Sequence, residues 1–406
     1  MKRFLSSIAV LLSLEAVAQT VRGGNDASGS IPMRYDRYLY LQGVVNDTLP
    51  GRFVFDLGAQ VTQLDSEWVI RHGLRFDRIQ IATLVGNGER TETALYSTDT
   101  LVLGLGSGSY ASSPNVIAPL SELMPGVDGL VGAAVFRDRI LRIDYEAGSL
   151  AVLPPEAVDT LTSDRYERLP FTIDERNFIE LPVTVVIDSA RRRTIRGTVF
   201  VDTGSPGEVG LRASERRLQQ WRRLARRGGR YVYFVPLLGF GGGGSVEMIR
   251  AQAVRIGGYE LPLRTVELRA AKSEEKEAEE GSQQIGAIGN ALLSRFGCVV
   301  FDMQGRQAYL PRGRRFDEVP PQVDYSGFRL GRVDHWFVNG ISHPAVELWN
   351  GDRVTHLDGH AIEELDERQR DAYFCTPDRH YRVTVVRGGE VLDIQVVNLN
   401  EKTRWH

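Results

Sequence analysis

The feature that most constrains this chain is a short motif that occurs twice, an apolar strand that ends in Asp-x-Gly. The first copy is Phe53-Val54-Phe55-Asp56-Leu57-Gly58-Ala59, and the second is Val199-Phe200-Val201-Asp202-Thr203-Gly204-Ser205. One Asp-x-Gly carries little information, because Asp bonds to its own backbone and Gly accepts positive φ in ordinary turns. Two copies carry more, since each one follows a predicted β-hairpin.

The sequence downstream of the two motifs also repeats. Each half continues to an apolar-apolar-Gly step that ends at Gly132 or Gly289, and then to a strand pair that ends in Leu-Pro. From Asp56 to Gly132 is 76 residues and from Asp202 to Gly289 is 87, a difference that one loop insertion at 272–284 explains. We therefore predict an internal duplication, with one aspartate at the equivalent turn of each half.

The composition and the N-terminal residues limit the class of protein that this chain can be. The 406 residues are 42% hydrophobic and 25% charged, as expected for globular domains, and the formal net charge of −3 argues against a nucleic-acid partner. Residues 1–18 combine a basic start, an apolar stretch and Ala16-Val17-Ala18, which predicts a secretory signal peptide. No later stretch is long and apolar enough to span a bilayer. We expect an exported protein, periplasmic or secreted, without a transmembrane anchor.

The residue types in the duplicated body exclude several kinds of chemistry. Between Met1 and Pro320 there is one histidine, His72, and one cysteine, Cys298. A Ser/His or Cys/His nucleophile needs a histidine beside it, and a zinc site needs at least three good ligands. We therefore expect no metal and no cofactor, and carboxylates remain as the reactive groups.

The body resembles the pepsin and retropepsin class of aspartic proteases over about residues 35–312. The resemblance rests on the two Asp-x-Gly turns, the two apolar-apolar-Gly steps and the closing strands. It implies that Asp56 and Asp202 are catalytic and face each other at the floor of a cleft that holds a polypeptide substrate. Two carboxyls that close share one proton, so the ionised one can activate water while the protonated one binds the peptide carbonyl oxygen.

The two turns are not identical, and the differences predict unequal roles. In the family a Thr hydroxyl braces the opposite turn; Thr203 can do so, whereas Leu57 cannot, which could let the first turn drift. Ser205 can donate to a carboxylate and Ala59 cannot, and donors favour the charged form. We therefore predict that Asp202 is ionised and Asp56 protonated. The residues expected to support the dyad are Gly58, Ala59, Thr203, Gly204 and Ser205.

Two glycine-rich hairpins are candidates for a flap that covers bound substrate. One turns at Gly86-Asn87-Gly88, and the other contains Gly241 and Gly242 in the run 239–244. Glycine at a hairpin tip permits both the turn and its movement. Simple surface turns explain either segment equally well.

A domain boundary is expected at 312–322, where arginines and a Pro-Pro pair break the strand pattern. Beyond it, residues 322–400 resemble a PDZ domain of the bacterial exported type, with Gly327-Phe328 before the peptide-binding strand. Such a domain would bind a peptide or a protein C-terminus along an open strand edge. The alternative is a small α+β domain that packs on the body without a ligand.

The expected architecture is mostly β, with two duplicated retropepsin-like β-barrel lobes at 35–155 and 165–312, a cleft between them, and a small α+β PDZ-like domain at 322–400. Three functions fit it. The first is an exported aspartic endopeptidase with a peptide-recognition domain. The second is a catalytically inactive, protease-like peptide-binding scaffold of the cell envelope, which Leu57 favours. The third is a structural envelope module that docks a partner C-terminus.

Overall fold

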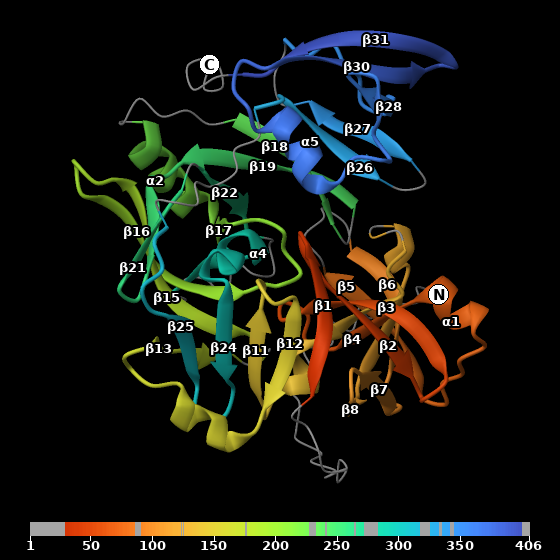
Figure 1. Ribbon diagram of the computed structural model, residues 1–406, viewed down its shortest axis with the longest axis vertical. Coiled ribbons are helices and arrows are strands. Elements are labelled where there is room, and N and C mark those ends of the chain that lie inside the picture. Colours follow the sequence, from red (N-terminus) through yellow and green to blue (C-terminus); the bar gives the residue numbers. More distant parts are fainter. Residues whose placement is uncertain are drawn as a thin grey trace, which may run out of the picture.

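A computed structural model describes residues 29–85, 91–122, 124, 126–174, 177–226, 233–239, 242–263, 265–271, 283–316, 325–332, 335–341 and 345–399. The protein is mostly β, and Figure 1 shows two lobes side by side with a C-terminal domain, in blue, above them. The predicted fold class is confirmed in this respect. The predicted signal peptide lies outside the described residues.

The first lobe runs from β1 to β12. Its elements are β1 (Ser30–Asp36), β2 (Tyr38–Val45), β3 (Leu49–Asp56), β4 (Thr62–Asp65), α1 (Ser66–Arg71), β5 (Ile79–Val85), β6 (Thr91–Ser97), β7 (Leu101–Leu105), β8 (Gly108–Ser112), β9 (Asn115–Ala118), η1 (Leu120–Glu122), β10 (Gly129–Gly132), η2 (Ala133–Phe136), β11 (Ile140–Asp144) and β12 (Ser149–Leu153).

The second lobe follows a short connection and repeats this order. Its elements are η3 (Pro155–Thr160), β13 (Tyr166–Pro170), β14 (Thr172–Ile173), β15 (Ile179–Asp188), β16 (Arg193–Val201), β17 (Val209–Ala213), α2 (Glu215–Arg226), β18 (Tyr233–Gly239), β19 (Gly242–Arg250), β20 (Ala253–Ile256), β21 (Tyr259–Pro262), β22 (Thr265–Ala270), β23 (Gln284–Ile288), α4 (Asn290–Leu293), η4 (Ser294–Phe296), β24 (Cys298–Asp302) and β25 (Gln307–Pro311).

The strand pairing of the two lobes is the same. β3 pairs antiparallel with β2 and parallel with β10, and β16 pairs antiparallel with β15 and parallel with β23. Likewise β4 pairs parallel with β9, and β17 with β22. The duplication expected from the sequence is therefore present in the sheet topology, and pairing register gives residue-by-residue equivalences between the lobes.

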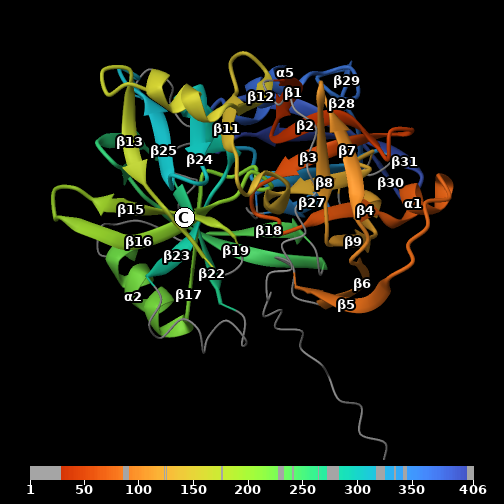
Figure 2. The ribbon, with the colours of Figure 1, turned by 90° about the horizontal axis from the view of Figure 1, so that it is seen from below.

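The lobes are joined by β-pairing and by a common core. β11 of the first half pairs antiparallel with β24 of the second, and Figure 2 shows the two strands side by side. Buried apolar residues from both halves form one continuous cluster, which includes Phe55, Leu57, Ile179, Leu181 and Phe301. This shared core fixes the two Asp-x-Gly turns relative to each other.

The C-terminal domain has a sheet and a core of its own. It comprises β26 (Phe328–Arg332), β27 (Trp336–Ile341), β28 (Arg353–Leu357), β29 (His360–Ala361), α5 (Glu367–Phe374), β30 (His380–Arg387) and β31 (Glu390–Val397), with the strand order β26-β27-β28-β30-β31. Asp366 and Gln369 start α5 with a reciprocal capping box. β27 packs against β18, so this domain contacts a hairpin of the second lobe.

Within the described part of the chain, none of the helices combines the length and the apolar character that crossing a membrane requires.

Candidate active site

Asp56 and Asp202 stand at equivalent ends of two strands. Asp56 is the last residue of β3, opposite Gly132 in the parallel β3–β10 pair. Asp202 directly follows β16, and its amide donates to the Ile288 carbonyl at 2.9 Å in the equivalent place. The strand pairing of each lobe therefore places its aspartate in the turn at the end of a core strand.

The two turns meet so closely that each aspartate lies over the glycine of the opposite turn. A Cβ atom placed on Gly58 would collide with the Asp202 carboxyl, and one placed on Gly204 would collide with the Asp56 carboxyl. Only glycine leaves room for the carboxyls at these two positions. The side chains of Asp56 and Asp202 also hydrogen-bond to each other. The arrangement is a carboxyl pair in direct contact.

Thr203 braces the first turn from the second. Its hydroxyl accepts a hydrogen bond from the Leu57 amide at 2.8 Å and donates one to the Phe55 carbonyl at 3.0 Å. Thr203 is fully buried, so both bonds are shielded from water. Asp56 lies between the two backbone groups that this hydroxyl holds, and its position is therefore fixed from the other lobe.

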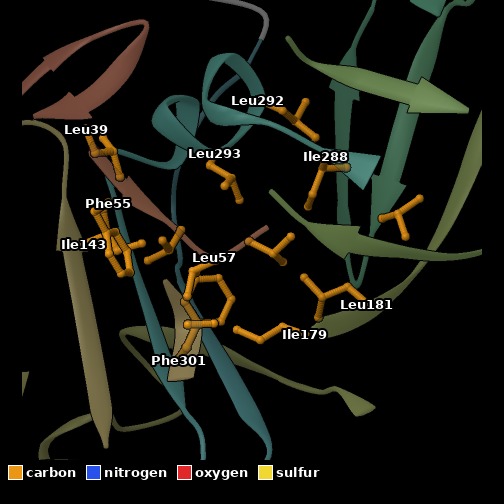
Figure 3. Packing of buried hydrophobic residues seen from close by; sticks show 14 of the residues in the cluster. Leu39, Phe55, Leu57, Ile143, Ile179, Leu181, Ile288, Leu292, Leu293 and Phe301 are labelled. Atoms are coloured by element: carbon orange, nitrogen blue, oxygen red, sulfur yellow. The ribbon is translucent and has the colours of Figure 1, made fainter. Parts of the chain in front are cut away.

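Leu57 fills the place where a second brace would stand. Its side chain is 1% exposed, and Figure 3 shows it among Phe55, Ile179 and Phe301 of the core shared by both lobes. The Ala133 amide also donates to the Ala59 carbonyl at 2.9 Å. The first turn, for which the sequence suggested drift, is thus held by apolar packing and backbone bonds.

Burial raises the pKa of both carboxyls, but not equally. Burial raises the pKa of Asp56 to about 6, and the backbone amides of Gly58, Gly204 and Ala59 limit that rise by donating to it. Burial and the neighbouring charge of Asp56 raise the pKa of Asp202 to about 8. The amide donors therefore favour Asp56 as the ionised member of the pair, with the proton on Asp202.

The sequence predicted the opposite assignment, with Asp202 ionised and Asp56 protonated, whereas the hydrogen bonds of the structure favour a charge on Asp56. It counted side-chain donors and expected Ser205 to stabilise a charged Asp202. In the structure the Ser205 hydroxyl accepts from the Gly207 amide at 3.4 Å. The donors that decide the assignment are backbone amides, which converge on Asp56. The Gly58 amide, for example, lies 2.7 Å from Asp56 Oδ1.

Asn290 is a residue of the site that the sequence reasoning missed. Its amide nitrogen donates to the Thr203 carbonyl at 2.6 Å and to the Arg37 carbonyl at 3.0 Å, and its oxygen accepts from the Tyr145 hydroxyl at 2.9 Å. It is 0% exposed. Asn290 therefore ties the Asp202 turn to two segments of the first lobe. The signal was available, since Asn290 follows Gly289 where Ala133 follows Gly132.

The flap candidates fall partly outside the described residues. Gly86, Asn87, Gly88 and Gly241 are not described, while Gly242 begins β19. The strands that lead to both tips form antiparallel hairpins, β5–β6 in the first lobe and β18–β19 in the second. These hairpins occupy equivalent places in the duplicated order, between a helix and the next strand pair. Their role as flaps stays a prediction.

The residues predicted to bind a peptide in the C-terminal domain lie at the start of an edge strand. Gly327 has φ +75°, a conformation that favours glycine, and Phe328 begins β26, which pairs with β27 on one side only. The Phe328 ring is buried against Phe374 of α5, with centroids 5.6 Å apart. The edge of β26 and the helix α5 thus come together at the turn named from the sequence.

Among the residues that the structure describes, no group of three or more His, Cys, Asp and Glu side chains gathers as a metal site would require.

Comparison with known proteins identifies the C-terminal domain. Residues 340–397 match the model of the family described as PDZ domain, so the chain carries a PDZ domain in this region. This confirms the resemblance for that part of the sequence; the bacterial exported type stays a prediction. No curated protein matches the sequence.

The body has pepsin-like and retropepsin-like aspartic proteases among its structural neighbours. An aspartic proteinase from Irpex lacteus is similar at TM-score 0.41 and 12% identity, over 70% of this chain and 96% of that one. Basic 7S globulin from soybean gives TM-score 0.40 and 10% identity, over 72% and 96%. A retropepsin-like aspartic protease from Rickettsia conorii gives TM-score 0.22 and 17% identity, over 30% and 86%.

Proposed function

We propose that this protein is an aspartic endopeptidase, in which Asp56 and Asp202 hydrolyse peptide bonds and the PDZ domain recognises a polypeptide. One observation carries the proposal: each carboxyl lies over the glycine of the opposite turn and hydrogen-bonds to the other. Two carboxyls in contact hold one proton between them, which provides a base and an acid at the same place.

The unequal environments assign the two roles. Ionised Asp56, which accepts the backbone amides, takes a proton from water as the water attacks the peptide carbonyl carbon. Protonated Asp202 donates a hydrogen bond to the carbonyl oxygen, where negative charge develops. As the C–N bond breaks, Asp56 gives the proton it took from water to the leaving nitrogen. Because water is the nucleophile, no covalent enzyme intermediate forms.

The PDZ domain supplies recognition away from the dyad. Its strand β26 stands at the edge of the sheet in the described residues, where a peptide would add as a further strand beside the turn at Gly327 and Phe328. We propose that this peptide is a substrate segment or a partner's C-terminus. The predicted signal peptide at 1–18 supports export to the periplasm or the medium.

The test is cleavage of a mixed peptide library, read by mass spectrometry from pH 3 to 9. The protein should cleave near neutral pH, and Asp56→Asn and Asp202→Asn should each lower the rate by about 10³-fold or more, since each removes one acid–base partner. Asp188→Asn changes a buried aspartate of the second lobe that pairs with Arg191, and it should retain cleavage. A protein that cleaves nothing across the series would contradict the proposal.

A second candidate, a protease-like scaffold that binds peptides without cutting them, is favoured by Leu57. At this position the first turn has a buried apolar side chain in place of a hydroxyl brace. The library experiment separates the two functions. A scaffold would bind peptides with the same affinity before and after Asp202→Asn, and neither form would cleave them.

A further inference from the structure

The second lobe has a charged surface beside the dyad, formed by Arg212 of β17 and by Glu267 and Arg269 of β22. Arg212 and Arg269 are opposite each other in the parallel β17–β22 pair. An ion pair of 2.6 Å joins Arg269 to Glu267, and the two side chains are 19% and 18% exposed. These groups are therefore partly shielded, yet still open to solvent.

This surface is on the opposite face of the strands from the core. Leu211 and Leu268, the neighbours of the charged residues, are buried in the core shared by the two lobes. Because successive side chains of a strand point to opposite faces, Arg212, Glu267 and Arg269 point away from that core. The charges are thus not part of the packing that holds the lobe together.

One contact and one electrostatic effect place the charged surface next to Asp202. The Glu267 carboxyl lies 3.7 Å from where a Cβ atom would stand on Gly207, in the turn that carries Asp202. Burial is the largest influence on the pKa of Asp202, and the charges of Arg269 and Arg212 oppose it. Both guanidinium groups are therefore within electrostatic range of the dyad.

The equivalent positions of the first lobe carry no guanidinium group. Asp65 of β4 is the equivalent of Arg212, and its carboxylate accepts from the Trp68 and Ser121 amides. The pairing register makes Val116 and Ala118 of β9 the equivalents of Glu267 and Arg269. Both are buried, in a small cluster with Ala94 that is separate from the main core. The two lobes thus have apolar Val116 and Ala118 on one side of the dyad where the other side has Glu267 and Arg269.

The charged surface of the second lobe can bind an anion. Its three side chains comprise two guanidinium groups and one carboxylate, so together they are net positive. The Arg269 Nε–H is buried and has no hydrogen-bond partner among the described residues. An unmatched buried donor is costly, and a carboxylate is the acceptor that a guanidinium binds best.

We propose, resting on the endopeptidase function above, that the enzyme selects polypeptides with an acidic side chain against the second lobe and an apolar one against the first. An extended substrate alternates its side chains between two opposite faces. The two residues that flank the scissile bond therefore face different lobes. Cleavage sites should pair one apolar residue with one Asp or Glu, with Arg269 as the specificity-determining residue.

The experiment has two stages and uses the full chain. Library cleavage first locates the enriched acidic position, and two synthetic peptides that differ only by Glu or Gln at that position are then compared. For the unaltered protein we expect the Glu peptide to have a kcat/KM about five- to tenfold higher, as for a partly buried ion pair.

Two substitutions should move this ratio in opposite directions. Arg269→Gln should bring it close to one, whereas Glu267→Gln, which releases Arg269 from its internal partner, should raise it. Arg255→Gln breaks an exposed ion pair with Glu260 elsewhere in the lobe and should leave the ratio unchanged. A purely structural ion pair would alter the rate on both peptides alike, and its loss in either variant would have the same sign.

The experiment distinguishes failure of the specificity inference from failure of the endopeptidase function. If the unaltered protein cleaves the library without an acidic preference, or keeps its ratio after Arg269→Gln, the specificity inference is overturned and the endopeptidase function stands. If it cleaves no peptide, both are wrong. Should Arg269→Gln fail to fold, a ratio that does not rise in Glu267→Gln overturns the inference by itself.

Discussion

The two Asp-x-Gly turns have the same backbone surroundings and opposite side-chain chemistry. In the second half, Thr203 and Asn290 are buried polar residues that bond across to the first lobe. In the first half, the equivalent residues are Leu57 and Ala133, which are buried and apolar. Thr203 and Asn290 therefore brace the dyad with hydrogen bonds from the second half, and the Tyr145 hydroxyl of the first half adds one to Asn290, while Leu57 and Ala133 contribute packing.

A duplicated site therefore does not need the same bracing side chain in both halves. A hydroxyl that bonds both flanks of Asp56 fixes the distance between the turns once, and a second brace would fix the same distance again. Asymmetry also has a use. The backbone amides that converge on Asp56 separate the proton affinities of the carboxyls, which gives each one a defined role.

Among the substitutions that follow, Thr203→Val should have the largest effect on activity. Valine keeps the shape of threonine but leaves the buried Leu57 amide and Phe55 carbonyl without the partner they have now. We expect kcat/KM to fall about 100-fold, because the first turn is no longer held in place. The free energy of unfolding should drop by roughly 2 kcal/mol, measured by urea denaturation.

Thr198→Val is the matched control for Thr203. Thr198 lies on β16, and its hydroxyl donates to Glu180 of the neighbouring strand β15 at 3.3 Å, away from the turn. Activity should change less than about twofold, since a hydrogen bond of this kind contributes about 1 kcal/mol or less to stability and none to the dyad. Equal losses in both variants would mean that the Thr203 brace has no special role.

Asn290→Ala should have the next largest effect. It removes the bonds to the Thr203 and Arg37 carbonyls, so the turn that carries Asp202 can shift. We expect kcat/KM to fall about tenfold, and the alkaline limb of its pH profile to move. Tyr145→Phe removes one Asn290 bond and should have a smaller effect. If the pH profile of kcat/KM keeps its shape in Asn290→Ala, Asn290 has only a structural role.

Leu57→Thr tests whether symmetry itself matters. The substitution shortens a side chain that is 1% exposed and adds a hydroxyl to an apolar cluster, so we expect a loss of about 2 kcal/mol in the free energy of unfolding. Activity should change less than about threefold, because Thr203 already sets the geometry. A tenfold gain in kcat/KM would show instead that the first turn is poorly held without its own hydroxyl.

The smallest effect in this series should be that of Asp202→Asn on stability, which is measured apart from its loss of cleavage. Since the folded-state pKa of Asp202 is raised from 3.8 to about 8, the stability it contributes is complete below pH 4 and is lost as pH rises toward 8. Asparagine mimics the protonated form. Its Tm should equal that of the unaltered protein near pH 4 and exceed it by about 2–4 °C above pH 8. A constant difference at every pH would argue against the raised pKa.

The sequence predicted the features that repeat. The duplicated strand order, the carboxyl pair at equivalent turns and the glycines beneath them follow from motifs that occur twice, because each copy constrains the interpretation of the other. The C-terminal domain was predicted from the turn at Gly327 and the pattern around it. The boundaries and site residues named there remain predictions for experiment.

What the sequence could not show depends on backbone geometry and on contacts between halves. Amide donors are present at every residue, so no motif reveals that those of Gly58, Gly204 and Ala59 converge on Asp56. That is why the sequence pattern placed the charge on Asp202 instead. Likewise, the role of Asn290 depends on Arg37 and Tyr145, which are distant in the chain and become its neighbours only when the lobes pack.

The dependence of kcat/KM on pH is the sharpest test of the shared proton, because it reports the acid and the base of the free enzyme. We expect a bell-shaped profile of kcat/KM that rises through about pH 6, as Asp56 ionises, and falls through about pH 8, as Asp202 loses its proton. Activity that appears only below about pH 3, or that continues undiminished well above pH 8, would contradict a carboxyl pair that works by sharing one proton.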